Sequence, residues 1–134
     1  MAHHHGLFLY LDLLLISFSV AGDDDTTIMT KLSNSISNSP STWRTEKHFC
    51  EWERITCDTS SHVTSINLSQ KSLNGILPSD LHKLSQLKTL DLQHNSFSGP
   101  LPTLANLTLL QQVFINSNVF TSIPPLPRFL SRSY

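Results

Sequence analysis

The sequence predicts an α/β solenoid: a short stack of repeated coils with parallel strands on its concave face and an N-terminal cap made of a helix and a disulfide. Three observations support this prediction. A pattern that starts at Val63 recurs at Leu87 and again at Leu110, the amphipathic segment DDDTTIMTKLSNSI precedes the first copy, and two cysteines bracket CEWERITC. Recurrence at a fixed period of roughly 20 to 50 residues is typical of solenoids.

The repeats are clearest in LKTLDLQHNSFSGPLP, positions 87–102. Laid over the chain from position 63, its pattern falls on VTSINLSQKSLNGILP, 63–78, and from position 110 it falls on LQQVFINSNVFTSIP, 110–124. The pattern L-x-x-L-x-L-x-x-N-x-L is that of leucine-rich repeats, each a short strand plus a returning turn segment. We therefore expect about three leucine-rich repeats at 63–124. That number is the lower limit for such stacks, which predicts marginal stability or dependence on a partner.

Within each repeat, inward leucines alternate with outward polar residues. Leu90 and Leu92 should point inward from a strand, and Asn95 should turn the chain, because its amide both donates and accepts hydrogen bonds. Asn118 has this position in the third copy, but Lys71 has it in the first. We expect the first copy to be the weaker one.

Residues 23–62 are expected to form the cap that covers the open end of the stack. Asp23–Asp25 suit the positive N-terminal end of a helix. The following SISNSPST is rich in Ser, Asn and Pro, which predicts a loop. The apolar face of the cap helix is expected to consist of Ile28, Met29, Leu32 and Ile36.

Cys50 and Cys57 are expected to form a disulfide, because a close pair in an oxidising compartment is most simply a bridge. Two alternatives are a metal site that adds His48 and His62, and a nucleophilic cysteine beside His48. The aromatic residues around the pair are expected to pack over the end of the stack, and a binding platform is the alternative. These residues are Trp43, Phe49 and Trp52.

The two ends of the chain depart from the repeats. GLFLYLDLLLISFSVAG predicts a secretory signal peptide at residues 1–22, although Asp12 interrupts its apolar run and histidines replace the usual basic residues. A short buried or anchoring helix is the alternative. Residues 125–134 form an off-pattern tail whose prolines disfavour another strand. We therefore expect the last repeat to expose the edge of its core.

Two Asn-x-Ser/Thr sequons, at Asn67 and Asn106, are predicted glycosylation sites and agree with secretion. No later segment approaches the roughly 18 apolar residues of a membrane span. The mature chain is therefore expected to be secreted, in the apoplast or at the cell surface, with no span of its own.

Composition excludes several classes of function. The net charge is −1 and charged residues make up 14%, so the basic patch of a nucleic-acid-binding protein is absent. Four glycines do not form a phosphate loop, and no V-A-I-K, H-R-D or D-F-G stretch occurs. We predict no enzyme activity, no catalytic residues, no cofactor and no metal.

The outward strand positions are predicted to stack in columns on the concave face and to form the partner-binding surface. Phe114 is the strongest candidate, because an exposed aromatic ring can bury a large area at an interface. Alternatively these are ordinary surface residues and the tail covers Phe114. A sugar on Asn67 would obstruct binding there. The columns are Ser65, Thr89 and Gln112; Asn67, Asp91 and Phe114; and Ser69, Gln93 and Asn116, with His94 just beyond.

These motifs resemble the plant extracellular leucine-rich repeat proteins, whose N-terminal cap carries C-x-W-x-G-V-x-C. Cys50, Trp52, Ile55 and Cys57 match this motif, while Arg54 replaces its glycine. The chain further resembles the N-terminal ectodomain of the transmembrane-kinase group of receptor-like kinases. That resemblance implies a truncated ectodomain of a plasma-membrane receptor, with a link to auxin signalling.

Three hypotheses follow for the function. The first is a module that binds a protein, a peptide or a co-receptor at the cell surface. The second is a secreted inhibitor of the polygalacturonase-inhibitor kind, which shares the S-G-x-L/I-P repeats but usually has more of them and a second cysteine-bearing cap. The third is a gene fragment without retained activity, which the abrupt tail favours.

Overall fold

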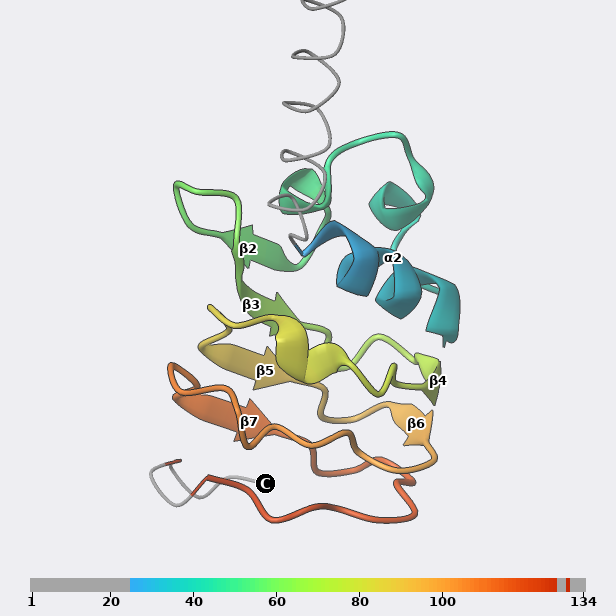
Figure 1. The fold of residues 1–134 in the computed structure, drawn as a ribbon. Helices are drawn as coiled ribbons and strands as arrows, with labels where there is room; N and C mark the ends of the chain where they lie inside the picture. The colour runs from blue at the N-terminus through green and yellow to red at the C-terminus, as the bar shows by residue number, and fades with distance from the viewer. Residues whose placement is uncertain (1–24, 128–129, 131–134) are drawn as a thin grey trace, which may run out of the picture.

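The computed structural model describes residues 25–127 and 130, so the predicted signal peptide lies outside the described residues. The coils lie one below another in a single column, with the cap at one end (Figure 1). The elements are helix α2 (Thr26–Ser35); 3₁₀ turns η1 (Ser41–Arg44), η2 (Phe49–Glu51) and η3 (Leu81–Lys83); and strands β1 (Ile36–Ser37), β2 (Ile55–Cys57), β3 (Val63–Asn67), β4 (Asn74–Ile76), β5 (Thr89–Asp91), β6 (Ser96–Ser98) and β7 (Gln112–Phe114).

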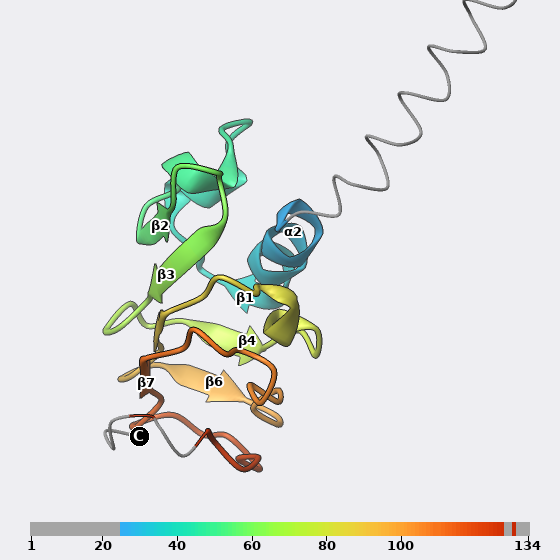
Figure 2. The same cartoon turned by 60° about the vertical axis from the view of Figure 1, so that its left-hand side comes forward.

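Two sheets run along the column on different sides, as Figure 2 shows. The first has the order β2-β3-β5-β7, in which β3, β5 and β7 are parallel and β2 is antiparallel to β3. The second has the order β1-β4-β6, with β4 and β6 parallel. Each repeat thus adds one strand to the first sheet, which confirms the predicted parallel stacking.

The α part of the predicted fold class is confined to the cap. Among the described residues the one α-helix is α2, and the return segments of the repeats contain short strands and the single turn η3. Prolines and glycines such as Pro78, Gly99 and Pro100 interrupt these segments. Proline and glycine are unfavourable inside an α-helix, which agrees with the short strands and turns of these segments.

The core consists of one leucine-rich layer per coil. Ile66, Leu90 and Val113 are paired in register across β3, β5 and β7, and all three are buried. Phe97 is also buried and stacks on Phe120, with 6.5 Å between the ring centroids. Leu92 is buried too, so the predicted inward positions are confirmed.

Asn95 and Asn118 join neighbouring coils as well as turning the chain. The amide of Asn95 donates to the carbonyl of Leu68 in the preceding coil at 2.7 Å, and Asn118 donates to the carbonyl of Leu92 at 2.7 Å. The Asn95 side-chain oxygen accepts from the N–H groups of Lys71 and Leu73 at 3.1 and 3.0 Å. The first coil has no preceding repeat, and its Lys71 instead lies 3.9 Å from Glu53 of the cap.

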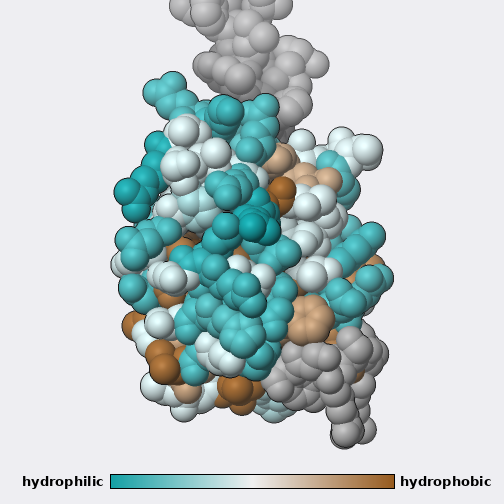
Figure 3. All heavy atoms as spheres, turned by 180° about the vertical axis from the view of Figure 1, so that it is seen from behind, coloured by the Kyte–Doolittle hydropathy of each residue, from teal (hydrophilic) through white to brown (hydrophobic). Residues whose placement is uncertain are grey.

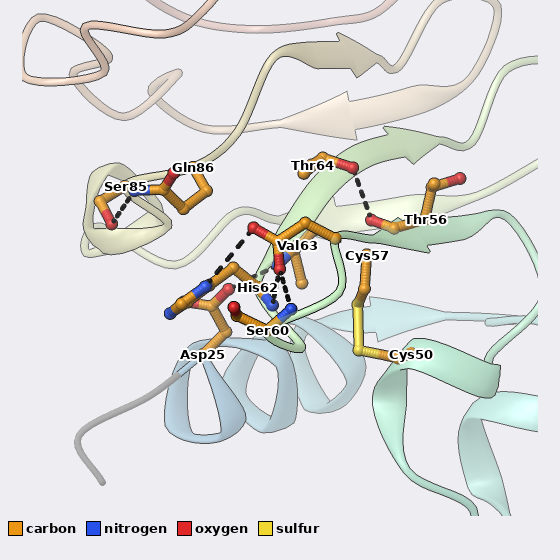
Figure 4. Close-up of polar contacts among 11 residues, drawn as sticks. Asp25, Cys50, Thr56, Cys57, Ser60, His62, Val63, Thr64, Ser85 and Gln86 are labelled. Carbon is orange, nitrogen blue, oxygen red and sulfur yellow. Dashed lines mark hydrogen bonds and ion pairs between the residues drawn. A yellow bond between two sulfur atoms is a disulfide. The ribbon is translucent and has the colours of Figure 1, made fainter. Parts of the chain in front are cut away.

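The cap helix packs as predicted but begins later. It starts at Thr26, and Ile28, Met29 and Leu32 are buried. Asp25 is only 5% exposed, and its Oδ2 accepts a hydrogen bond from the Val63 N–H at 2.7 Å (Figure 4). This carboxylate therefore ties the start of the helix to the first repeat strand.

The predicted loop after the helix is in part a strand. Ile36 is buried and pairs with Gly75 of β4 in an antiparallel bridge. A Cβ on Gly75, which has φ +140°, would lie 2.0 Å from the Ser35 carbonyl oxygen. The absence of a side chain at Gly75 thus lets the chain after α2 join the second sheet, a long-range contact that local composition does not reveal.

The disulfide and the aromatic cover are confirmed. Cys50 and Cys57 are bonded, which also excludes the two alternatives that needed free thiols. Trp43 is buried and stacks on Trp52 at 5.2 Å between centroids, so these rings pack over the end of the stack and are not a free platform. Phe49 meets Trp52 edge to face at 6.5 Å.

The far end of the stack is more covered than predicted. The segment after Ser122 runs beneath the last coil toward the β7 side (Figure 1). Leu130 is 6% exposed and Leu126 packs on the core, so tail residues cover part of the edge that we expected to be open. Val119 and Ile123 nevertheless remain 61% and 54% exposed. Seen from behind, the described surface is mostly hydrophilic, with hydrophobic residues mainly over its lower coils (Figure 3).

Candidate binding face

The predicted columns are in register on the first sheet. Ser65 lies opposite Thr89, and Thr89 lies opposite Gln112. The second column likewise joins Asn67, Asp91 and Phe114. The third column continues the same ladder, because the N–H of Gln70 donates to the carbonyl of Gln93 and that of His94 donates to the carbonyl of Asn116, both at 3.1 Å. We call this surface the ladder face. Its residues are Ser65, Asn67, Ser69, Thr89, Asp91, Gln93, His94, Gln112, Phe114 and Asn116.

Solvent reaches every side chain of the ladder face. The ladder-face residues of the first two repeats are half-buried, except His94, which is exposed. In the third repeat Phe114 is half-buried, and Gln112 and Asn116 are exposed. His94 has φ +57°, a left-handed conformation that Gln70 and Ser117 share at the same point of their coils. The strands therefore end in equivalent turns, which keeps the columns aligned.

Hydrogen bonds along the strands fix the polar side chains of the middle column. Asp91 accepts from the Gln93 N–H and from its side-chain amide, at 3.2 and 3.1 Å. Asn67 accepts from the N–H and the hydroxyl of Ser69, at 3.4 and 3.1 Å. These contacts fix the orientation of the side-chain oxygen atoms of Asp91 and Asn67.

Two carboxylates near the junction of the cap and the first repeat have a lowered pKa. The Lys31 ammonium lies 2.6 Å from Asp80 Oδ2 and lowers the pKa of that carboxyl. The other oxygen, Asp80 Oδ1, is buried and has no hydrogen-bond partner in the described part of the chain. A hydrogen bond from the His62 N–H lowers the pKa of Asp58 in the hairpin between β2 and β3. Both groups serve the structure of the cap and its junction with the first repeat.

The two sequons lie in different settings. Asn67 is half-buried in β3, and its side chain is already hydrogen-bonded, whereas Asn106 is exposed in a turn between the second and third strands of the ladder face. A sugar on Asn67 would occupy the ladder face, and one on Asn106 would not lie in its columns. Glycosylation of both residues remains a prediction.

Arg54 is a neighbour of the ladder face that sequence reasoning missed. The Asn67 N–H donates to the Arg54 carbonyl at 3.0 Å, so Arg54 continues the row of Asn67, Asp91 and Phe114 into the cap. Arg54 has φ +73°, which explains why glycine is usual at this point of the motif. The sequence signal that could have pointed to Arg54 is its replacement of the glycine in the C-x-W-x-G-V-x-C motif.

The described residues do not form a metal centre or a membrane span. Within 25–127 and 130, no group of three or more His, Cys, Asp or Glu residues is arranged to hold a metal ion. No helix in that part of the chain has the length and apolar character needed to cross a bilayer.

Comparison with known proteins identifies similar chains. A family model described as "Leucine rich repeat N-terminal domain" matches residues 22–58, and one described as "Leucine Rich Repeat" matches 86–107. The receptor-like kinases TMK4 and TMK2 of Arabidopsis thaliana are each 35% identical over 87% of this chain. The chain spans only 12% and 13% of their lengths.

A solved structure shares the fold. The Arabidopsis receptor kinase HAESA, whose structure is a complex with the peptide hormone IDA and the co-receptor SERK1, is 28% identical, with a TM-score of 0.61. The match covers 73% of this chain and 18% of that one.

Proposed function

We propose, from the premise that this chain is a leucine-rich repeat protein similar to the ectodomains of plant receptor-like kinases, that it is an extracellular recognition module. Its ladder face binds a peptide, a protein or a co-receptor at the cell surface. The similarity to TMK4, TMK2 and HAESA supports a receptor type of binding over the polygalacturonase-inhibitor alternative. A role in auxin-related signalling is a prediction from the resemblance to the transmembrane-kinase group.

One observation carries the proposal. Three strands present polar and aromatic side chains in aligned columns, and each of these side chains is accessible to solvent. A row of fixed hydrogen-bonding groups suits an extended peptide that crosses the strands. Phe114 at the end of the row offers the apolar contact that anchors many interfaces.

A selection experiment tests the proposal. The chain, secreted from a plant or insect cell, is used to select from a displayed library of random dodecapeptides, and dissociation constants are measured by calorimetry. We expect Phe114→Ala to weaken selected peptides about tenfold or more, as at an interface hot spot. Leu109→Ala is the control, because Leu109 is an exposed apolar residue outside the ladder columns. Selected peptides whose affinity is equal for both variants, or no selected peptide at all, would contradict the proposal.

A further inference from the structure

We infer that Asp91 and Phe114 form a subsite for a guanidinium group, so that the ladder face prefers an extended peptide with an arginine at this point. The inference rests on the proposed function and names the chemistry of its ligand. It depends on the adjacent positions of the two residues, on the hydrogen-bond acceptor positions that the Asp91 carboxylate leaves unused, and on the Phe114 ring beside it.

The two side chains are direct neighbours. Asp91 and Phe114 are register partners on the parallel strands β5 and β7, and adjacent strands lie about 4.8 Å apart. Leu90 and Leu92 flank Asp91 and are buried, as Val113 and Ile115 are around Phe114. Because side chains alternate along a strand, Asp91 and Phe114 both project from the opposite, accessible face.

The carboxylate of Asp91 can accept more hydrogen bonds than it receives. An ionised carboxylate has about four acceptor positions, and Asp91 accepts from the backbone N–H and the side-chain amide of Gln93. The ion pairs found among residues 25–127 and 130 involve Asp80, Asp58 and Glu53. An accessible carboxylate with unused acceptor positions can take charge-assisted hydrogen bonds from a ligand cation.

The charged groups around Asp91 do not replace that cation. Along its own row the basic residue is Arg54, whose backbone lies two strand spacings, about 10 Å, from that of Asp91, and the ion pairs of the described residues do not join the two. His94 is exposed three positions further along the chain, and its N–H bonds Asn116. The negative charge of Asp91 is therefore available to a partner.

Phe114 determines which cation fits best. Phe114 is half-buried and lies on β7, the outermost strand of the sheet. The neighbour of Asp91 on that side is therefore an aromatic ring. An aromatic face attracts cations, and a planar guanidinium can stack on it while donating two hydrogen bonds to a carboxylate. An ammonium group cannot make both contacts as well, so arginine should bind more tightly than lysine.

The test uses the tripeptide acetyl-Gly-Arg-Gly-amide and the neutral analogue in which citrulline replaces arginine. Each is titrated into the ¹⁵N-labelled chain, and amide chemical shifts are followed. We expect the arginine peptide to shift the amides of Asp91, Gln93 and Phe114 and to bind about fivefold or more tightly than the citrulline peptide. Raised salt should reduce the difference, because the contact is between charges.

Variants separate the subsite from general charge attraction. Asp91→Asn and Phe114→Leu should each weaken the arginine peptide about fivefold or more. Glu51→Gln removes the same charge from an exposed turn of the cap and should change nothing. The ¹⁵N spectrum of each variant shows whether it is folded, and the solvent-accessible setting of both positions favours retention of the fold.

Two results of the titration would overturn the inference. Equal affinity for the arginine and citrulline peptides would show that no guanidinium is recognised, and shifts located away from β5 and β7 would place binding elsewhere. The proposed function is judged separately by the library selection. Selected peptides that need Phe114 but contain no excess of arginine and tolerate Asp91→Asn would leave the recognition module standing and remove only this subsite.

Discussion

At the cap end, the first repeat is joined to a helix, a disulfide-bonded turn and two stacked indoles, whereas at the far end the third repeat meets a segment that carries Leu126 and Leu130. Specific polar contacts also concentrate at the cap. Asp25 accepts from the Val63 N–H, and Lys31 pairs with Asp80. At the far end Val119 and Ile123 stay exposed.

This difference indicates which end of the described coils is better stabilised. Repeat proteins gain stability from contacts between neighbours, so each end of a stack lacks half of its contacts unless a cap supplies them. Here the cap supplies them at one end, through contacts such as those of Asp25 and Lys31 with the first repeat. We therefore expect substitutions at the cap junction to cost more stability than equivalent substitutions toward the far end.

The largest effect should follow from Gly75→Ala. A Cβ at Gly75 would lie 2.0 Å from the Ser35 carbonyl oxygen, a backbone atom, and φ is +140°. We expect a loss of about 3 kcal/mol or more in the free energy of unfolding, measured with urea.

Gly99→Ala is the matched control for that change. The heavy atoms nearest to its Cβ would be side-chain atoms of Ile76, at 3.0 to 3.3 Å, and its φ is +68°. The expected cost is about 1 to 2 kcal/mol, which is the cost of a left-handed conformation. A larger loss for Gly99→Ala than for Gly75→Ala would contradict the importance of the cap junction.

The asparagine ladder should show the same gradient with a smaller amplitude. Asn95→Ala leaves the N–H groups of Lys71 and Leu73 and the Leu68 carbonyl without their partner. We expect it to cost about 3 kcal/mol, because unsatisfied backbone groups are expensive. Asn118→Ala removes one accepted bond, from the Phe97 N–H, and should cost about 2 kcal/mol. Equal losses in urea unfolding would refute the gradient.

Removal of the disulfide should also lower the free energy of unfolding. Cys50 and Cys57 are bonded across a short loop, and closing a loop of this size stabilises by roughly 2.5 kcal/mol in the chain-entropy model. The double variant Cys50→Ser, Cys57→Ser should lose about that amount in urea unfolding. An unchanged midpoint would show that the indole stack alone holds the cap.

The smallest expected effect is a loss of stability at acid pH, which arises from carboxylates near the cap. The pKa of Asp80 is lowered in the folded state, chiefly by the hydrogen bond from Lys31, so its contribution is present above the unfolded pKa of about 3.9 and is lost as pH falls through the folded pKa. Asp58 adds in the same direction. Asp80→Asn should therefore lose less stability than the wild type as the pH is lowered from neutral to acid. An identical pH dependence in the two proteins would exclude this role for Asp80.

Much of this arrangement follows from local sequence, and the rest does not. The period of the repeats aligns Asn67, Asp91 and Phe114 correctly, because a regular period places equivalent residues side by side. The pairing of Ile36 with Gly75 could not be inferred, since it joins segments far apart in the sequence through the absence of a Cβ. Arg54 shows the limit of motif matching, because only its φ of +73° reveals the constraint behind the usual glycine.

Native-state hydrogen exchange measures the difference between the two ends most directly. We expect the amide of Leu68, which bonds the Asp91 carbonyl near the cap, to exchange more slowly than that of Leu92, which bonds the Phe114 carbonyl one coil further on. Protection should fall again at Val119, whose N–H bonds the Phe97 carbonyl. Faster exchange at Leu68 than at Val119 would show that the cap does not stabilise the stack from its end.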